Sequence, residues 1–276
     1  MFDFLHTFHP SPILAAFGPF IIRWYGLLFA VGSIVGILII RSLALRYRLR
    51  EETILGLCFT VLVSGFIGAR LYHVLNELPY YWQHPLEIIM VWRGGLAFHG
   101  GLLAGLAALI VYCRRHGLHP LWATDLIVPG LLIGQAIGRW GNYFNQELFG
   151  RPTALPWGIP IDFSNRPTGM TQSMFFHPTF LYESLWNVLL FTLFFFWHRR
   201  AQKPGSGGQR AGIITFAYLI LSSLGRFATE LLRVDRTPII AGVRLPLLLS
   251  AGIALASIIA LWILLRKPIS SQPLPR

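Results

Sequence analysis

Seven apolar segments, each long enough to cross a bilayer, constrain the fold more than any other feature of this sequence. A helix of roughly 20 apolar residues spans the hydrocarbon core of a membrane. Candidates occur at 20–40, 54–75, 96–113, 121–138, 177–197, 211–230 and 244–265. The chain is 54% hydrophobic and only 12% charged, which is typical of polytopic membrane proteins and not of soluble domains. We expect an all-α fold with about seven transmembrane helices in a single domain over residues 1–276.

Basic residues are divided unequally between the connections. The connections after the first, third and fifth segments and the C-terminal tail hold thirteen lysines and arginines, and the opposite face holds nine. Because basic connections stay in the cytoplasm, we place the N-terminus outside, in the periplasm, and the C-terminus in the cytoplasm. The net charge of +12 therefore encodes topology, and we expect no nucleic acid partner.

Two long connections lie on the outer face. Residues 76–95 are rich in interfacial aromatics, as expected for a segment at the depth of the lipid headgroups. Residues 139–176 contain four prolines and are too long for a simple turn. We predict that 139–176 form a periplasmic arm or small lobe.

Polar and ionisable residues gather at the ends of five apolar segments, all in the predicted outer leaflet. Chance would scatter such residues over both leaflets, so their common depth indicates a site. They are Arg23 and Tyr25, His99, Arg139 and Asn142, the group His177, Tyr182 and Glu183, and the group Arg226, Glu230 and Arg233.

Two of these groups allow a structural and a functional interpretation. The stretch 138–150, which includes Asn145 and Glu147, is either a loop anchored in the headgroup layer or part of a binding site. Arg226, Glu230 and Arg233 share one helix face. They form either an intrahelical ion pair with a snorkelling arginine, or an anion site in which Glu230 positions Arg226.

Two isolated polar residues are also notable. His99 lies among four glycines, and it is either a satisfied structural residue or a catalytic group in contact with substrate. Arg70 lies inside the second segment and needs an anionic partner there. Asp125 and Glu183 are the candidates, and we expect Arg70 to be structural.

Several kinds of site are excluded. The sequence has no HExxH motif, no serine nucleophile signature and no P-loop. Its two cysteines, Cys58 and Cys113, cannot form a metal cage. We therefore expect no metal, and any enzymatic nucleophile belongs to the substrate.

Five motifs together resemble the bacterial prolipoprotein diacylglyceryl transferase family. They follow the family order across almost the whole chain: RWYG (23–26), GGLAFHGG (94–101), GRWGNYFNQELFG (138–150), HPTFLYE (177–183) and RFATELLR (226–233). The resemblance implies transfer of the sn-1,2-diacylglyceryl group of phosphatidylglycerol to the lipobox cysteine of a prelipoprotein. A thioether forms and glycerol-1-phosphate leaves, in the first step of lipoprotein maturation.

The resemblance also implies roles for individual residues. We predict catalytic roles for Tyr25, His99, Arg139 and Arg226. The predicted substrate-binding residues are Arg139, Asn142, Asn145, Glu147, Gly150, His177, Tyr182, Glu230 and Arg233. A thiol needs a base, for which histidine is suited; an arginine or a bound phosphate oxygen is the alternative to His99.

The implied partners are phosphatidylglycerol, prelipoprotein signal peptides and membrane lipids, with no cofactor. We expect a monomer in the bacterial cytoplasmic (inner) membrane, with its active site towards the periplasm. A transporter of phospholipids or anions is the alternative class. It would place charges along a path to both faces and show internal repeats, whereas this chain concentrates them on one side and shows no repeat.

Overall fold

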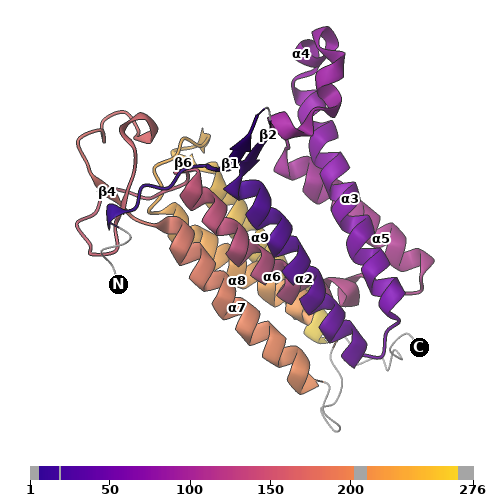
Figure 1. The fold of residues 1–276 in the computed structure, drawn as a ribbon. Helices are drawn as coiled ribbons and strands as arrows, with labels where there is room; N and C mark the ends of the chain where they lie inside the picture. The colour runs from indigo at the N-terminus through magenta and orange to yellow at the C-terminus, as the bar shows by residue number, and fades with distance from the viewer. Residues whose placement is uncertain (1–5, 19, 202–209, 267–276) are drawn as a thin grey trace. The chain divides into compact units, whose positions relative to one another are not determined.

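The computed structural model describes residues 6–18, 20–201 and 210–266. Within these ranges each predicted segment is a helix of 18 residues or more (Figure 1). The seven are α2 (Trp24–Arg46), α3 (Glu51–Asn76), α5 (Phe98–Arg115), α6 (Pro120–Phe144), α7 (Thr179–Ala201), α8 (Ile213–Glu230) and α9 (Leu245–Arg266). Five of them, α2, α3, α6, α7 and α9, are long and apolar enough to cross a membrane. The chain is therefore a mainly helical, multi-pass membrane protein.

Several helix ends differ from the prediction, including the end of α2, at Arg46 and not at residue 40, and the end of α7, at Ala201 and not at residue 197. The first helix begins at Trp24 and not at residue 20, because β2 (Phe20–Arg23) pairs antiparallel with β1 (Ile13–Phe17). The fourth helix continues past residue 138 to Phe144, so Arg139 lies within it. Hydrophobicity marks neither end, because the strand before α2 is apolar like the helix, whereas the last turns of α6 already contain the polar residues Arg139 and Asn142.

Short strands add to the helical fold. In the described residues, β3 (Ile159–Pro160) pairs with β4 (Phe175–Phe176), and β5 (Ile239–Ile240) pairs with β6 (Val243–Arg244). A 3-10 helix, η3 (Phe163–Asn165), lies between β3 and β4. The predicted connection 76–95 contains α4 (Leu78–Gln83), η1 (Pro85–Ile89) and η2 (Val91–Arg93).

The chain forms two compact units. Among the described residues, the first comprises the chain up to Ile40 and from Asp125 onwards, and the second comprises Arg41–Thr124. Most of α2 and α6 and all of α7, α8 and α9 belong to the first unit, while α3, α4 and α5 belong to the second.

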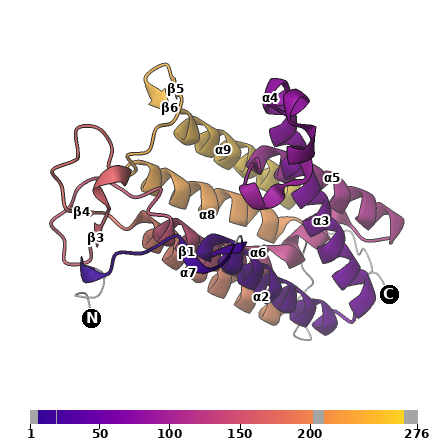
Figure 2. The same cartoon turned by 45° about the horizontal axis from the view of Figure 1, so that its top comes forward.

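In the first unit, α6, α7 and α8 surround a buried apolar core, and α9 packs against α8 (Figure 2). The core residues are Val128, Leu132, Leu190, Phe194, Ile214 and Tyr218. Asp125 is also buried, and it accepts hydrogen bonds from the N–H groups of Gly212 and Thr215, each at 2.7 Å. These N–H groups would otherwise lack acceptors at the N-terminus of α8, so Asp125 caps that helix.

Glycines bring α2 and α6 into close backbone contact. A Cβ atom added to Gly36 would lie 2.7 Å from the carbonyl oxygen of Gly130, and one added to Gly32 would lie 3.0 Å from that of Gly134. Apolar side chains gain little by leaving lipid for a helix interface, so helices in membranes associate through close packing of small residues. This contact fixes α2 along the helix that carries Arg139.

The connection between α6 and α7 folds as a lobe with its own core (Figure 2). Its buried aromatic and aliphatic residues come from the end of α6, the connection itself and the start of α7. They are Tyr143, Phe149, Ile159, Ile161, Phe176 and Phe180. The connection predicted at 139–176 therefore starts six residues later, after α6 has ended at Phe144.

A polar network joins this lobe to the N-terminal segment. The buried Gln146 donates to the carbonyl of Pro10 at 2.9 Å and to the Asp162 carboxylate at 2.7 Å, and accepts from the Asp162 N–H at 2.7 Å. His9 Nδ1 lies 3.0 Å from Asp162 Oδ1. The hydrogen bonds from His9 and Gln146 hold the pKa of Asp162 below its ordinary value.

In the second unit, α3 and α5 pack through glycines. A Cβ atom on Gly100 would overlap Tyr72 Cβ and the Gly68 carbonyl oxygen, whereas one on Gly105 would meet no atom closer than 3.7 Å. The two helices therefore touch backbone to backbone beside the first turn of α5, which carries His99.

Arg70 is buried as predicted, but the expectation of an anionic partner is wrong. Its guanidinium donates to four backbone carbonyls and lies over the ring of Tyr81 at 5.2 Å. The acceptors are the carbonyl oxygens of Glu87, Ile88 (2.8 Å), Gly94 (2.8 Å) and Gly95 (2.9 Å). Asp125 instead caps α8, and Glu183 pairs with other arginines. Irregular backbone leaves carbonyls without partners, and Arg70 satisfies them.

We predict that Gly100→Ala destabilises the protein by about 1–3 kcal/mol, because the added methyl group is forced into backbone. Gly105→Ala is the matched control on the same helix, and it has ordinary packing distances. The measurement is the thermal unfolding midpoint in detergent micelles. Equal midpoints for the two variants would show that the contact between α3 and α5 is looser than described.

The pKa of Asp162 gives a second prediction. A carboxyl group with a depressed pKa in the folded state stabilises that state above its unfolded pKa of about 3.9, and loses this contribution as the pH falls further. We expect wild type to unfold at a higher temperature than Asp162→Asn at pH 6, and the difference to shrink by pH 3. A difference that is constant with pH would contradict the described network.

Candidate active site

Three arginines surround one carboxylate in the first unit. Glu183 of α7 lies 2.9 Å from Arg139 Nε, 3.4 Å from Arg226 Nη1 and 3.7 Å from Arg233 Nη1. The Thr229 hydroxyl donates to the same carboxylate at 3.2 Å. Glu183 thus joins α6, α8 and the turn after α8 through three arginines, each more than 40 residues from Glu183 in the sequence.

A second carboxylate continues the network. Glu230 is fully buried at the end of α8, with Arg226 Nη2 2.9 Å from its Oε2. Arg244, just before α9, donates through Nε to Glu230 Oε1 at 2.8 Å. Arg233 in turn donates through Nε to Asp235 at 2.7 Å. The predicted pairing of Glu230 with Arg226 is thus present, with Arg244 as a further partner of Glu230.

We call this cluster the arginine network, and it carries a net positive charge of one. Its members are Arg139, Arg226, Arg233, Arg244, Glu183, Glu230 and Asp235. The Arg233 side chain is 2% exposed, and its Nη1 has no hydrogen-bond partner among the described residues. Arg139 and Arg226 are about 30% exposed. A buried unpaired donor and a surplus positive charge suit an anion such as a phosphate.

The last turn of α6 carries the predicted polar residue Asn142, and the loop after α6 carries Asn145 and Glu147. Asn142 and Asn145 donate to Glu147 Oε1 at 2.7 and 3.3 Å. Gln146 and Leu148 on either side of Glu147 have φ values of 49° and 57°, in the left-handed region that side chains disfavour. The structure therefore brings these three predicted residues together, on a backbone held in an uncommon conformation.

Gly150 ties this loop to two helices. Its N–H donates to the His177 carbonyl at 2.9 Å, and it forms a β-bridge with Arg233. A Cβ atom there would lie 2.8 Å from His177 Cβ and 3.1 Å from Thr179 Cγ2. Glycine is therefore required by the close approach of the segments before α7 and after α8, and the position is structural support for Arg233.

His177 and Tyr182 contact each other. The Trp157 indole donates to the Tyr182 oxygen at 2.8 Å, and that hydroxyl lies 3.1 Å from His177 Nδ1. Burial lowers the pKa of His177. Because the indole can only donate, the Tyr182 oxygen accepts from Trp157, and the Tyr182 hydroxyl is free to donate a hydrogen bond to Nδ1 of a neutral His177. These two predicted residues thus bond to the lobe, and their role towards a substrate stays a prediction.

The two remaining predicted catalytic residues lie in different units. Tyr25, near the start of α2, packs on Gly141 of α6, where an added Cβ atom would be 2.6 Å from its ring. His99 lies in the first turn of α5 in the second unit. It is exposed, with its ring 6.3 Å from that of Tyr72, and its chemical role stays a prediction.

Comparison with known proteins agrees with the motifs. The profile of the prolipoprotein diacylglyceryl transferase family matches residues 12–263. The chain belongs to this family. Relatives named phosphatidylglycerol–prolipoprotein diacylglyceryl transferase include one from Synechococcus elongatus, 46% identical over 82% of this chain and 78% of its own. Another, from Parasynechococcus marenigrum, is 41% identical over 96% of this chain and 97% of its own.

In this diacylglyceryl transferase family member, Asp235 and Arg244 of the arginine network were not predicted as site residues, and neither was Thr229 beside them. Glu183 was placed among the polar residues that indicate a site, but without a role of its own. A carboxylate inside an apolar helix needs partners, so Glu183 in HPTFLYE could have been recognised as the centre of a charge cluster. The described residues contain no group of three or more metal-ligating side chains.

We predict that Glu183→Gln lowers the stability of this transferase by roughly 3–5 kcal/mol, because it leaves buried arginines uncompensated. Glu77→Gln is the control, since Glu77 is exposed and surface changes usually stay within about 0.5 kcal/mol. Unfolding midpoints in micelles compare the two variants. Similar midpoints would show that Glu183 does not hold the network together.

Proposed function

We propose that this chain transfers the sn-1,2-diacylglyceryl group of phosphatidylglycerol to the cysteine thiol of prelipoproteins. The observation that carries the proposal is the arginine network, with its net positive charge and its exposed edge at Arg139 and Arg226. The printed names of the relatives and the family support the substrate and the reaction.

The reaction moves negative charge onto the phosphate. The thiolate sulfur attacks the glycerol carbon that carries the phosphate, a C–S bond forms, and the C–O bond breaks. Its electron pair stays on the phosphate oxygen, so a singly charged diester becomes glycerol phosphate with two negative charges. Fixed donors aimed at such growing charge contribute roughly 2.7–4 kcal/mol each in comparable sites. The arginine network would supply them.

The geometry supports a division of roles. Arg139 and Arg226 are partly exposed and would contact the phosphate directly. The buried Glu183 and Glu230 hold these guanidinium groups in place before substrate binds. Since a preorganised donor needs no rearrangement during reaction, both carboxylates raise the rate without contacting the lipid. Tyr25, Asn142 and Asn145 would contact the headgroup or the signal peptide.

We assign the thiol proton to His99, whose exposed imidazole can act as a general base. A phosphate oxygen is the alternative acceptor, and it would carry the proton away with glycerol phosphate. Neither route uses a cofactor. His99→Ala distinguishes them, because turnover that stays near wild type would assign the proton to the phosphate.

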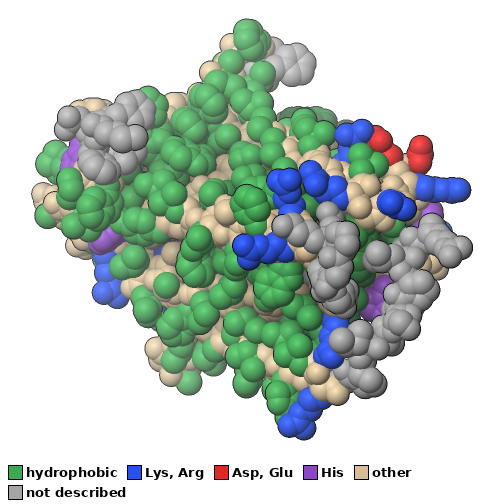
Figure 3. Space-filling model, turned by 90° about the horizontal axis from the view of Figure 1, so that it is seen from below, with side chains coloured by type: hydrophobic (Ala, Val, Ile, Leu, Met, Phe, Trp, Pro, Cys, Tyr) green, Lys and Arg blue, Asp and Glu red, His purple; other side chains and the backbone are tan. Residues whose placement is uncertain are grey.

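We further propose seven spans in the bacterial inner membrane, with the N-terminus periplasmic, the C-terminus cytoplasmic and the active site near the periplasm. The excess of basic residues after α2, α5, α7 and α9 supports this orientation. Figure 3, which shows the structure from below relative to Figure 1, has several Lys and Arg side chains among mainly hydrophobic ones. We also propose that the protein acts as a monomer.

The test is transfer in vesicles containing phosphatidylglycerol and a lipobox peptide, followed by mass spectrometry. We expect the peptide cysteine to gain one diacylglyceryl group while glycerol phosphate is released, and a peptide with serine in its place to stay unmodified. An unmodified cysteine, together with movement of lipid or anions across the vesicle, would support a transporter instead.

Arg139→Lys should lower kcat/KM by about 100-fold or more, because lysine cannot reproduce a guanidinium that contacts both Glu183 and a phosphate. Arg46→Lys, at the exposed end of α2, serves as the control and should retain wild-type kcat/KM. The proposed phosphate site would be wrong if Arg139→Lys kept half of the wild-type value.

A further inference from the structure

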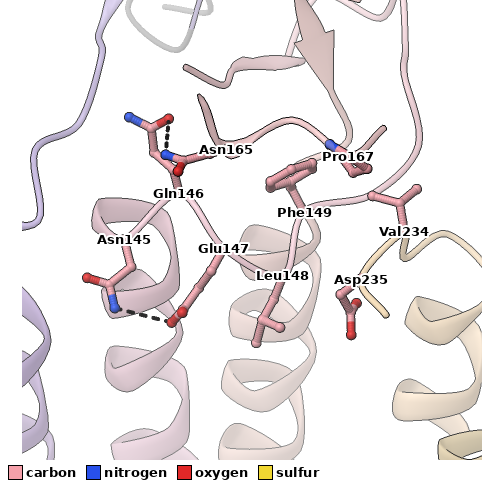
Figure 4. Close-up of a pocket in the computed structure, with 9 residues that line it drawn as sticks. All are labelled: Asn145, Gln146, Glu147, Leu148, Phe149, Asn165, Pro167, Val234 and Asp235. Carbon is pink, nitrogen blue, oxygen red and sulfur yellow. Dashed lines mark hydrogen bonds between the residues drawn. The ribbon is translucent and has the colours of Figure 1, made fainter. Parts of the chain in front are cut away.

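A cavity of about 290 Å³ lies beside the arginine network, between the loop after α6 and the turn after α8 (Figure 4). Its polar walls are Asn145, Glu147, Asn165 and Asp235, and its apolar walls include Phe149 and Val234. A water molecule takes about 30 Å³ in the liquid. The cavity therefore has room for a small organic group with several polar atoms.

Asp235 belongs to both the cavity and the arginine network. It lines the cavity, and it accepts a 2.7 Å hydrogen bond from Arg233 Nε. The other side of that guanidinium, Nη1, is buried without a hydrogen-bond partner among the described residues. Nη1 lies 3.7 Å from Glu183, the carboxylate that also pairs with Arg139 and Arg226, so Arg233 links the Asp235 wall of the cavity to the arginines that would bind a phosphate.

The cavity walls are built to accept hydrogen bonds. Glu147 and Asp235 each use some of their acceptor sites on Asn145 and Arg233, and a carboxylate has about four in all. The amide oxygens of Asn145 and Asn165 supply further acceptors. The hydrogen-bond donors that fit are hydroxyl or ammonium groups.

Charge distinguishes these two kinds of donor. Asp235 is already paired with Arg233, and the network behind it has a surplus positive charge. An ammonium group would be brought towards that positive charge, whereas a neutral hydroxyl would not. The apolar wall formed by Phe149 and Val234 suits the carbon chain of a small polyol.

We propose that this cavity binds the terminal glycerol of phosphatidylglycerol, the part that leaves as glycerol phosphate. The inference rests on the proposed function and deepens it, because it makes the cavity the determinant of headgroup choice. Phosphate on the arginine network and glycerol hydroxyls on Glu147, Asn165 and Asp235 would fix the lipid at two points. The leaving group, glycerol phosphate, would then orient the diacylglyceryl carbon at which the thiolate attacks.

The inference makes headgroup preference the quantity to measure. Phosphatidylmethanol has the same charge and the same reacting carbon but lacks the glycerol hydroxyls. A site built to bond a hydroxyl rejects an analogue without it, since its polar groups are then left unpaired. We expect wild type to prefer phosphatidylglycerol over phosphatidylmethanol by at least tenfold in kcat/KM.

Two variants test the walls. Asn165→Leu removes polar groups from the cavity and Val234→Phe fills part of it, while Ser164→Ala is the neighbouring control outside the cavity lining. We expect both cavity variants to reduce the preference for phosphatidylglycerol at least fivefold, mainly through its KM. Ser164→Ala should keep the wild-type preference.

The outcomes separate this inference from the proposed function. If wild type transfers from neither lipid, the proposed function fails. The glycerol site is wrong if wild type is active but the cavity variants lower kcat/KM equally for both lipids, or leave the preference for phosphatidylglycerol unchanged. Equal wild-type transfer from phosphatidylethanolamine would also overturn it, because the cavity would then accept an ammonium group.

Discussion

The need to pair buried charges governs the first unit of this protein. Glu230 is fully buried and Glu183 nearly so, and an unpaired carboxylate in such surroundings costs several kcal/mol. Glu183 is compensated by arginines of other segments, and Glu230 by Arg226 of its own helix and by Arg244, so α6, α7, α8 and the turn before α9 must meet at one place. The same pairing leaves one positive charge in excess, and it leaves Arg233 Nη1 3.7 Å from Glu183 without a hydrogen bond among the described residues. Pairing of the buried carboxylates thus gathers arginines into a candidate anion site. The ion pairs also fix the orientation of these arginines before a substrate binds.

Close backbone contact is the second condition on which this arrangement depends. Gly36 and Gly130 let α2 approach α6, and Gly150 lets the loop after α6 reach the ends of α7 and α8. In a membrane, helices gain little from burying apolar side chains, so such contacts contribute much of the packing. These contacts also fix the register of one helix along the other, because shifting either helix would bring a larger side chain against the backbone of its neighbour. Glycine contacts therefore help to hold Arg139 and Arg233 in place.

Hydrophobic length predicted all seven helices, because a bilayer imposes that length on any spanning segment. It missed where α2 begins, since the adjoining strand is also apolar, and where α6 ends, since the last turns of that helix are polar like the loop that follows. Local spacing predicted that Glu230 pairs with Arg226, one helical turn away. Pairs across segments, such as Glu183 with Arg139 or Glu230 with Arg244, leave no local pattern in one sequence. The partners of Arg70 could not be predicted either, because they are backbone carbonyls, which every residue carries.

The central claim is that the arginine network binds the lipid phosphate. The most direct measurement is a crystal structure with a phosphatidylglycerol analogue whose reacting C–O bond is replaced by C–C. The account predicts phosphate oxygens within hydrogen-bond distance of Arg139 and Arg226, with Glu230 still paired to Arg244. A bound lipid whose phosphate lies elsewhere, while Glu183 keeps all its arginines and no anion touches them, would contradict it.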